Sequence, residues 1–252
     1  NYPDMLDVPS SAKSPQQMFG AVAKGIWAKE EGIDRKDLIV VSVMPCLAKK
    51  YESSRDEFKV DGNPDVDYSI STRELAKLLK QANINLPTLE ESVMDNPLGD
   101  YTGAAVIFGR TGGVIEAATR TAYEWITNDT LGNVDFEQLR GMEGIRVAEV
   151  SIPGLDEKLG SKFRIGIAHG LGAARELLDK IRAGEETLHA IEIMACKGGC
   201  VGGGGQPFHH GDIRKSHENP YIKELYAKHL GKPNSHLAHE LLHTKYFPKH
   251  KI

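Results

Sequence analysis

The chain alternates between short apolar runs and longer segments with helical periodicity. Apolar runs rich in β-branched residues predict buried strands at residues 37–44, 146–152, 162–170 and 189–196. Apolar residues that recur every three or four positions predict helices at residues 14–32, 71–82, 172–184, 219–231 and 235–246, and a further helix within residues 104–126. This alternation indicates an α/β fold, and the continuously apolar first strand favours parallel pairing.

The first predicted helix carries signals at both ends. Ser14 is the expected N-cap, Pro15 takes the first helical position, and Gln17 completes a capping box. Gly32 ends the helix, because glycine accepts the left-handed conformation of a helix C-terminus. Apolar Met18, Val22 and Ile26 are expected to line one face of this helix.

The remaining segments follow the same rules. Ser71 and Glu74 predict a second capping box, and Gly184 ends the helix predicted at 172–184. The helix within 104–126 follows a glycine turn. Between these elements we expect a charged loop from Lys49 to about Asp67 and a polar surface excursion at residues 85–100.

Length and charge limit the classes of function. The 252 residues allow one large domain or two smaller lobes. With 35 acidic and 31 basic residues, the chain gives no electrostatic reason to expect nucleic acid or an anionic membrane as a partner. Its apolar runs are too short for a membrane span. The first residues lack an initiator Met and a signal-peptide pattern, so we expect a fragment or a processed chain.

The three cysteines are the main chemical signal. An odd number in a chain of this length argues against a disulfide framework and leaves buried thiols, one reactive thiol or metal ligands. Cys46 and Cys196 each follow the carboxyl end of a predicted strand, where α/β proteins gather ligand chemistry. Three thiolates are one short of the four that iron–sulfur clusters usually take.

A run of four glycines at residues 202–205 follows Cys200 almost at once. It has neither the Gly-Lys-Ser/Thr of a phosphate loop nor the GxGxxG of a dinucleotide site. One interpretation is a flexible loop. The other is a backbone that approaches a bulky prosthetic group closely, which residues without a side chain allow.

Two zinc hypotheses also have to be weighed. The HELLH segment at 239–243 matches the zinc-protease signature but lacks a third ligand downstream, since Tyr246 and Lys249 occupy the positions where the longer pattern needs Gly and His. An amphipathic helix explains the segment as well. Cys196, Cys200 and a histidine of residues 209–210 could form a structural zinc site, but this leaves Cys46 and the glycines unexplained.

Two segments together resemble signature sequences of the iron-iron (FeFe) hydrogenases. They read MPCLAKKYE at residues 44–52 and EIMACKGGCVGGGGQP at residues 192–207. The stretches SSAKSPQQMFGA, STRELAKLLKQA, the region from PLGDY to TAYE, and the tail with HELLHT are also similar to that family. The resemblance therefore covers nearly the whole chain and supplies a non-zinc explanation for HELLH.

The resemblance implies an architecture. The family fold has two lobes of mostly parallel sheet flanked by helices, with the cofactor in the cleft between them and a C-terminal helical tail. Residues 1–207 would form the H-cluster catalytic domain without its first cysteine motif, and residues 208–252 a helical tail like the small subunit, packed on that domain.

The resemblance also implies a cofactor. The H-cluster is a 4Fe–4S cubane joined through a cysteine sulfur to a two-iron site that carries CO, cyanide and a bridging dithiolate. Cys46 and Cys196 would ligate the cubane, and Cys200 would ligate it and bridge to the two-iron site. Lys49 would hydrogen-bond a cyanide ligand, and Ser10 would relay protons.

Other residues would surround the cofactor. Met44 and Met194 would shield the two-iron site with apolar contacts, although methionines in such positions are more often core fillers. The expected lining of the pocket is Ser14, Gln16, Pro45, Phe108 and Gly109.

The chain departs from the family pattern in one important respect. The first signature, Thr-Ser-Cys-Cys-Pro, which supplies the fourth cubane ligand, is absent. Upstream sequence could supply it, another chain could supply it, or the activity could be lost; we favour the first. The connection at residues 205–220 also looks shorter than in the family.

The activity that the resemblance implies is reversible hydrogen oxidation and proton reduction. Its partners would be hydrogen and protons as substrates, a ferredoxin or another redox protein, and further hydrogenase subunits. A tail joined to the catalytic region suggests a cytoplasmic enzyme. The alternatives are an iron–sulfur assembly relative that binds only a cubane, a hydrogen sensor without efficient turnover, and a zinc-binding interaction module.

Overall fold

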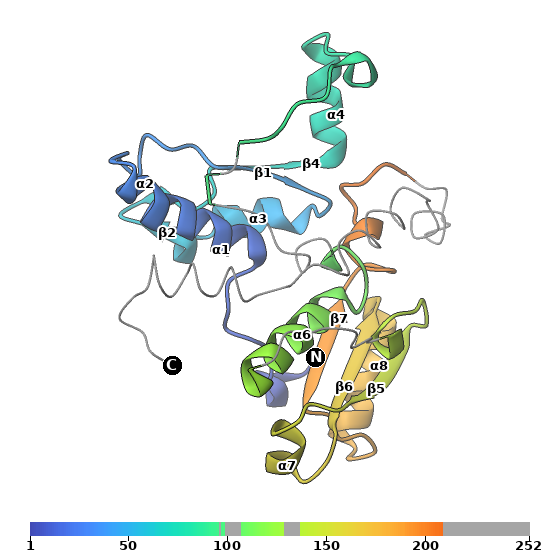
Figure 1. Ribbon diagram of the computed structural model, residues 1–252. Coiled ribbons are helices and arrows are strands. Elements are labelled where there is room, and N and C mark those ends of the chain that lie inside the picture. The colour runs from blue at the N-terminus through green and yellow to red at the C-terminus, as the bar shows by residue number, and fades with distance from the viewer. Residues whose placement is uncertain (96, 99–106, 129–136, 209–252) are drawn as a thin grey trace. The chain divides into compact units, whose positions relative to one another are not determined.

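The computed structural model describes residues 1–95, 97–98, 107–128 and 137–208. The chain divides into two compact units, Asn1–Gly99 and Asp100–Ile252, and each is described by itself (Figure 1). The helices predicted at 219–231 and 235–246, and the HELLH segment with them, lie outside the described residues. No helix in the described ranges combines the length and the apolarity that crossing a membrane requires.

The first unit consists of helices around a short parallel strand pair. Its α-helices are α1 (Pro15–Val22), α2 (Ala28–Glu30), α3 (Ala48–Ser54) and α4 (Thr72–Gln81), and its strands are β1 (Val41–Met44), β2 (Lys59–Val60), β3 (Asn63–Pro64) and β4 (Tyr68–Ser71). A π-helical turn, Ala23–Trp27, joins α1 to α2, and 3-10 turns lie at Pro3–Met5, Asp56–Phe58 and Leu86–Thr88.

The first predicted helix is confirmed as α1, the π turn and α2, with Pro15 at its start and Gly32 beyond its end at φ 71°. Its predicted capping box is wrong. Ser14 is the N-cap residue, but its hydroxyl donates to Glu52 at 2.6 Å instead of accepting a helix amide. The face that carries Met18 is not the most buried one, because Met18 is exposed while Gln17, Lys24 and Ala28 are buried.

Strands β1 and β4 form the parallel pair expected for the first strand, with Val41 opposite Tyr68 and Met44 opposite Ser71. The strand is shorter than its apolar run. It is also not buried on both faces, since Val41, Val43 and Tyr68 are exposed while Ser42 is buried. Burial on both faces of a parallel sheet needs a covering layer on each side.

The segment from Lys49 to Asp67, expected as a loop, is largely ordered structure. It contains α3, a 3-10 turn and the antiparallel β2–β3 hairpin. Its many charged residues misled the prediction, because short helices and hairpins on a surface need few apolar residues. By contrast, residues 85–95 of the predicted surface excursion are exposed throughout.

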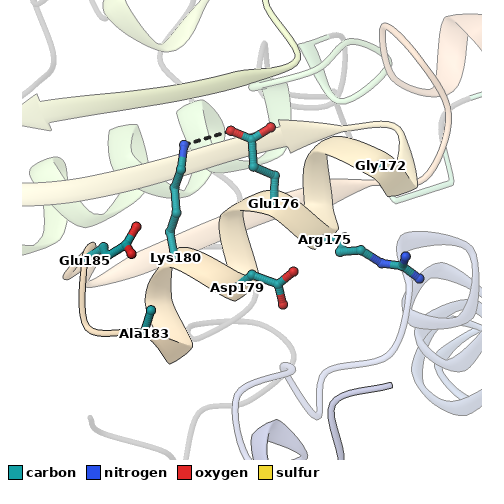
Figure 2. Close-up of a pocket in the computed structure, with 7 residues that line it drawn as sticks. All are labelled: Gly172, Arg175, Glu176, Asp179, Lys180, Ala183 and Glu185. Carbon is teal, nitrogen blue, oxygen red and sulfur yellow. Dashed lines mark hydrogen bonds and ion pairs between the residues drawn. The ribbon is translucent and has the colours of Figure 1, made fainter.

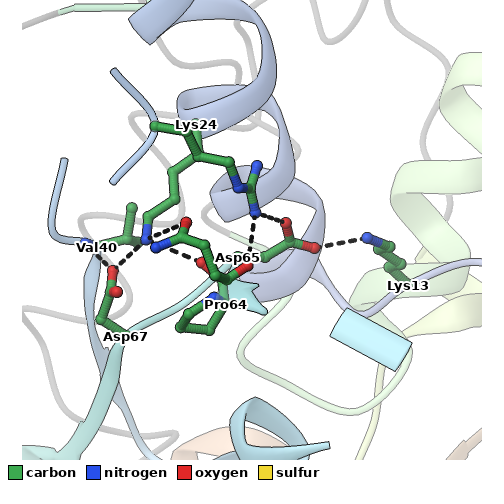
Figure 3. A network of polar contacts seen from close by, with 8 residues as sticks. Lys13, Lys24, Val40, Pro64, Asp65 and Asp67 are labelled. Atoms are coloured by element: carbon green, nitrogen blue, oxygen red, sulfur yellow. Dashed lines mark hydrogen bonds and ion pairs between the residues drawn. The ribbon is translucent and has the colours of Figure 1, made fainter. Parts of the chain in front are cut away.

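A buried polar network replaces much of the apolar core of this unit (Figure 3). The Lys24 ammonium has no exposed side-chain surface and lies 2.6 Å from the Asp67 carboxylate. Lys24 also donates to the Pro64 carbonyl at 2.9 Å, and Asp67 accepts the Val40 amide at 2.7 Å. The network therefore links the long first helix to the segments that lead into β1 and β4.

A second carboxylate extends this network. Asp65 is buried and binds Arg35 and Lys13, each at 2.6 Å. Gly20 of α1 lies so close to this segment that an added Cβ would stand 2.4 Å from the Asp65 carbonyl oxygen. The helix and the segment before β4 are thus held together by charge pairs and by close backbone contact.

The second unit is a three-stranded sheet between helices. In the part of this unit that the structure describes, the α-helices are α6 (Gly113–Thr127), α7 (Leu155–Leu159) and α8 (Leu171–Arg182), and the strands are β5 (Ile145–Val150), β6 (Phe163–His169) and β7 (Ala190–Met194). 3-10 turns lie at Glu137–Leu139 and Cys200–Gly202. The sheet order is β5-β6-β7, with β6 parallel to β7 and antiparallel to β5.

Helices cover both faces of this sheet (Figure 1). Ile115 and Tyr123 of α6 pack on a core that includes Ile165 and Ile167, whereas Leu177 of α8 packs with Ala168 on the other side. Every residue of β6 from Ile165 to His169 is buried as a result. This two-sided burial explains the apolar run of the central strand.

The predicted α/β class is confirmed, and so are the strands at 146–152, 162–170 and 189–196 and the helices at 71–82 and 172–184, each within two residues at either end. The helix predicted within 104–126 is α6, Gly113–Thr127. Gly112 makes the predicted turn before α6, and Gly184 follows α8 with φ 73°. The sheets are parallel at β1–β4 and β6–β7, and β5 is an antiparallel edge strand.

Replacement of Lys24 by Met should destabilise the first unit by about 3–5 kcal/mol, because it leaves the Asp67 carboxylate without its buried partner. Urea unfolding followed by Trp27 fluorescence, in a Trp125→Phe background, measures this. The double variant Lys24→Met/Asp67→Leu should recover part of the loss, and Lys29→Met, an exposed change nearby, should cost little. A loss under about 1 kcal/mol for Lys24→Met would contradict the role of the pair.

The capping box of α4 should give a pH dependence. Hydrogen bonds from Lys50 and from Ser71 lower the pKa of Glu74 from 4.5 to about 2. Because the folded pKa lies below the unfolded one, this stabilisation is present above about pH 4.5 and is lost as the pH falls through about 2. An NMR titration of the Glu74 carboxyl should have its midpoint near the lower value, and Glu74→Gln should flatten that part of the acid unfolding curve. A midpoint at the ordinary value would refute the box.

Candidate functional site

The two cysteine segments begin in the same way. Strand β1 ends at Met44 and strand β7 ends at Met194, and each is followed two residues later by a cysteine. The positions predicted for Cys46 and Cys196, just past a strand's carboxyl end, are therefore confirmed. All three cysteines of the chain lie in the described ranges, are half-buried and stand outside disulfides.

In the first unit, one carboxylate gathers the predicted polar residues. Glu52 of α3 accepts hydrogen bonds from the Ser14 hydroxyl at 2.6 Å, the Gln16 side-chain amide at 2.8 Å and the Lys49 ammonium at 3.0 Å. Gln16 also donates to the Lys49 carbonyl, and its oxygen accepts the Ser42 hydroxyl at 2.8 Å. The start of α1, strand β1 and helix α3 are thus joined around Lys49.

The charge of Glu52 stabilises this cluster. Burial acts to raise the pKa of Glu52, but the hydrogen bonds from Ser14, Gln16 and Lys49 outweigh it and hold the pKa below its usual value. Glu52 therefore remains a carboxylate at neutral pH, and Lys49 keeps a charged partner. The direction of the Lys49 side chain is fixed by that pair.

Ser10 lies apart from this cluster in the chain. Ser10 is exposed, and its hydroxyl accepts a hydrogen bond from the Ala12 amide at 3.2 Å. Pro45 and Met44 are half-buried next to Cys46. Of the residues predicted in this unit, Ser14, Gln16 and Lys49 are brought into direct contact, whereas Ser10 is placed by local backbone structure.

In the second unit, Glu192 of β7 caps helix α6 from outside the helix. Its two carboxylate oxygens accept the amides of Gly112 at 2.6 Å and Ile115 at 2.9 Å, and the Val114 amide also bonds to it. A helix N-terminus leaves such amides without partners, and a carboxylate both satisfies them and complements the helix dipole. Sequence reasoning missed this role, although a single carboxylate in an apolar strand was its signal.

The environment of Glu192 is nearly closed to solvent. Burial raises the pKa of Glu192, while the three amide bonds and the Arg146 charge act in the opposite direction. Arg146 is itself buried and donates to the Thr111 hydroxyl at 3.2 Å. The turn before α6 is therefore held by Glu192 at its amides and by Arg146 at its side chain.

The loop between Cys196 and Cys200 is fastened to this same turn. Thr111 donates its amide to the Gly198 carbonyl at 3.0 Å, and Val201 donates its amide to the Gly109 carbonyl at 2.8 Å. Gly199 has φ 97°, and a Cβ on it would stand 2.6 Å from the Thr111 nitrogen. Only glycine combines that conformation with so close an approach.

The glycine run that follows is structured rather than loose. The Gly202 and Gly203 amides bond to the Gly199 and Cys200 carbonyls within a 3-10 turn. Gly203 and Gly205 are buried. The interpretation as a flexible loop is therefore wrong.

The five predicted residues of this unit lie on two segments that contact each other. Cys200 is adjacent in sequence to Val201, whose amide donates to the Gly109 carbonyl at 2.8 Å. Phe108 precedes Gly109 and packs against a short apolar cluster with Ile107. Met194 and Cys196 lead into the same loop from β7. The arrangement presents two half-buried thiols from a loop whose backbone is fixed on both sides.

A separate hollow of about 470 Å³ lies over α8 (Figure 2). It is lined by Gly172, Arg175, Glu176, Asp179, Lys180, Ala183 and Glu185. Its chemistry is that of a charged helix surface, with Lys180 paired to Glu176 at 2.8 Å. It contains no thiol, so the cysteine loop is the better candidate for binding a soft metal.

Comparison with known proteins identifies relatives. The chain is 59% identical over its whole length to the NADP-reducing hydrogenase subunit HndD of Solidesulfovibrio fructosivorans and covers 45% of that protein. It is 40% identical to iron hydrogenase 1 of Clostridium pasteurianum, with 97% of the chain and 46% of the relative covered. The chain therefore spans about half the length of these curated relatives.

A solved hydrogenase structure and a more distant relative are also similar to the chain. The structure of the FeFe-hydrogenase HydA(deltaEFG), which revealed stepwise H-cluster assembly, matches with a TM-score of 0.70 at 40% identity, covering 96% of this chain and 70% of that one. The cytosolic iron–sulfur assembly factor narfl of Xenopus tropicalis is more distant, at 28% identity over 96% of the chain.

Two family profiles match successive parts of the chain. The profile described as iron hydrogenase small subunit matches residues 209–249. The profile described as iron only hydrogenase large subunit, C-terminal domain, matches residues 1–204. Since this second match spans most of the sequence, the chain belongs to the family of iron-only hydrogenase large subunits.

Proposed function

We propose that the chain is the H-cluster part of an iron-iron hydrogenase, an oxidoreductase that acts on hydrogen. The observation that carries the proposal is the 59% identity to a hydrogenase subunit along the whole chain. The reaction is reversible, with two protons and two electrons on one side and one hydrogen molecule on the other. The H-cluster, when bound, supplies the redox and hydrogen-binding chemistry.

The donor set fits this cofactor. Three half-buried thiols outside disulfides are soft ligands suited to iron. Cys46 and Cys196 would ligate the cubane, and Cys200 would ligate it and bridge to the two-iron site. A cubane takes four ligands, so the fourth must come from outside these 252 residues.

The chain's own residues would hold and shield the cofactor. Lys49, oriented by Glu52, would donate to a cyanide ligand, since an ammonium favours an anionic group. Met44 and Met194, both half-buried at strand ends, would exclude water from the two-iron site. The exposed Ser10 hydroxyl would pass protons toward the site.

Other residues would complete the walls of the pocket. Ser14 and Gln16 would do so through the Glu52 cluster, which fixes their side chains. Pro45 would contribute from the cysteine segment of the first unit, and Phe108 and Gly109 from the turn that contacts Val201.

The organisation and partners follow from the same proposal. Residues 1–207 would form the catalytic domain and residues 208–252 a tail like the small subunit. A ferredoxin or another redox protein would exchange electrons with the cubane, and further hydrogenase subunits would join the assembly. Because a segment that matches the small-subunit profile lies in the same chain, we propose a cytoplasmic enzyme.

Two alternatives share part of this chemistry. An iron–sulfur assembly protein would bind a cubane alone, and the lower identity to that group, 28% for narfl against 59% for HndD, favours the hydrogenase. A hydrogen sensor would bind the same cofactor with little turnover, and an activity assay separates it from an enzyme.

The test is to produce the chain together with a segment that carries the fourth cysteine ligand, to supply the two-iron cofactor without oxygen, and to record the infrared spectrum and hydrogen evolution. Carbonyl and cyanide bands together with hydrogen evolution are expected. Bands without turnover would indicate the sensor, and iron and sulfide without bands would indicate the assembly relative.

Cys200→Ser should remove the bands and abolish activity, because a hydroxyl is a poor bridge between iron sites. The matched control is Lys197→Ala, an exposed change within the same loop, which should retain both. Normal bands with full turnover in Cys200→Ser would show that this sulfur is not the bridge.

Lys49→Met should lower occupancy of the two-iron site at least about tenfold while the cubane remains, because one charge-assisted hydrogen bond is lost. Iron content and the infrared bands measure the two parts separately. The neighbouring Lys50→Met is the control, since Lys50 pairs with Glu74 on the surface. Equal occupancy in both variants would be incompatible with the role of Lys49.

A further inference from the structure

A buried histidine contacts the cysteine loop from a neighbouring strand. His169 ends β6, is 7% exposed, and accepts the Gly198 amide at its Nδ1 at 2.9 Å. Its other nitrogen, Nε2, lies 3.3 Å from the Met142 carbonyl oxygen. Neither the sequence motifs nor the proposed function accounts for this residue.

The two contacts define the state of the ring. A backbone amide always donates, so Nδ1 must carry a lone pair; a carbonyl always accepts, so Nε2 must carry the hydrogen. Burial lowers the pKa of His169, and the charges of Arg146 and Lys197 act in the same direction. The ring is therefore neutral near pH 7, with its acceptor facing the loop.

The contacted residue occupies the middle of the loop. Gly198 is buried, has φ 78°, and is two residues from Cys196 and two from Cys200. Its amide is held by His169 of β6, and its carbonyl is held by the Thr111 amide of the turn before α6. One residue between two thiols is thus fixed from both sides by different elements.

Loss of the histidine ring would remove the acceptor to which the buried Gly198 amide donates. Removing the acceptor of a buried amide is unfavourable, and the loop can reduce this penalty by turning the peptide toward water. A turned peptide at Gly198 would change the directions of both neighbouring thiols. Ligands must be held closely in place to bind a metal well, so this change affects metal binding.

We propose that His169 is a positioning residue for the Cys196–Cys200 loop and acts through its Nδ1 acceptor. The proposal rests on the proposed function, in which both thiols bind iron. It assigns to His169 no contact with the cluster. Its effect is exerted through the Gly198 peptide alone.

Two substitutions separate this role from simple burial. In His169→Asn the side-chain oxygen can occupy the place of Nδ1 and accept the Gly198 amide. In His169→Gln the oxygen reaches the place of Nε2 instead, so an equally polar side chain fails to accept that amide. His189, which precedes β7, is the matched control. Its Nδ1 accepts the Arg164 amide of β6 at 2.9 Å, and its ring stacks on Phe163.

The first measurement is hydrogen exchange of the Gly198 amide by NMR in the metal-free chain. We expect His169→Gln to exchange about tenfold faster than wild type, and His169→Asn to stay within about twofold. His189→Gln should leave the Gly198 amide unchanged. The ¹⁵N shift of His169 Nδ1 in wild type should be that of an unprotonated, hydrogen-bonded nitrogen.

The second measurement is uptake of iron and sulfide, with the electron paramagnetic resonance of the reduced cluster. His169→Gln should take up several-fold less iron and give an altered spectrum, and His169→Asn should restore both. Equal behaviour of the Asn and Gln variants in the exchange and uptake measurements would overturn the proposal, and so would an equal effect of His189→Gln.

The two measurements distinguish failure of the proposed function from failure of the proposal for His169. If wild type, produced with a segment that carries the fourth cysteine ligand, takes up no iron under conditions that load a known hydrogenase, the proposed function fails and the metal-positioning role fails with it. The exchange data then still decide whether His169 holds Gly198. If wild type loads iron but exchange at Gly198 is the same in all variants, only the proposal for His169 is overturned.

Discussion

The second unit depends on a carboxylate held at the start of a helix. Glu192 belongs to β7, yet it satisfies amides of Gly112, Val114 and Ile115 at the start of α6. Without Glu192, the amides at the start of α6 would lose their acceptor and the helix dipole would face an apolar strand. Both changes would lower the stability of the unit. Because the cysteine loop begins just after Glu192, the same bond that joins strand and helix also sets where that loop starts.

The two signature segments each contain a cysteine and a glutamate that anchors the surrounding structure. Each joins a cysteine to a glutamate in a single motif, Glu52 six residues after Cys46 and Glu192 four residues before Cys196. Neither glutamate is a proposed metal ligand. Glu52 collects a hydroxyl, an amide and an ammonium, whereas Glu192 collects backbone amides. The glutamates in these motifs thus hold neighbouring segments together by hydrogen bonds, whereas the cysteine thiols are the proposed metal ligands.

Sequence patterns predicted the positions of helices and strands better than they predicted which side chains those elements bury. The parallel pairing of β1, the capping box of Ser71 and Glu74, and the two cysteine positions followed from local signals, and the α/β class followed from the alternation of elements. The buried face of the first helix did not, because Gln17 and Lys24 fill it and no hydropathy pattern places a lysine inside. His169 and Glu192 also escaped prediction, since their partners lie 29 and 77–80 residues away.

Close backbone contact explains why so much of the site is glycine. A Cβ on Gly113 would stand 1.7 Å from the Ile107 carbonyl oxygen, and one on Gly199 would stand 2.6 Å from the Thr111 nitrogen. Neither residue carries a reactive group, yet a side chain at Gly113 would displace the backbone at Ile107, and one at Gly199 would push apart the turn and the cysteine loop. Backbone atoms cannot adapt as a flexible side chain can, so the directions of the thiols are set by these contacts before any metal binds.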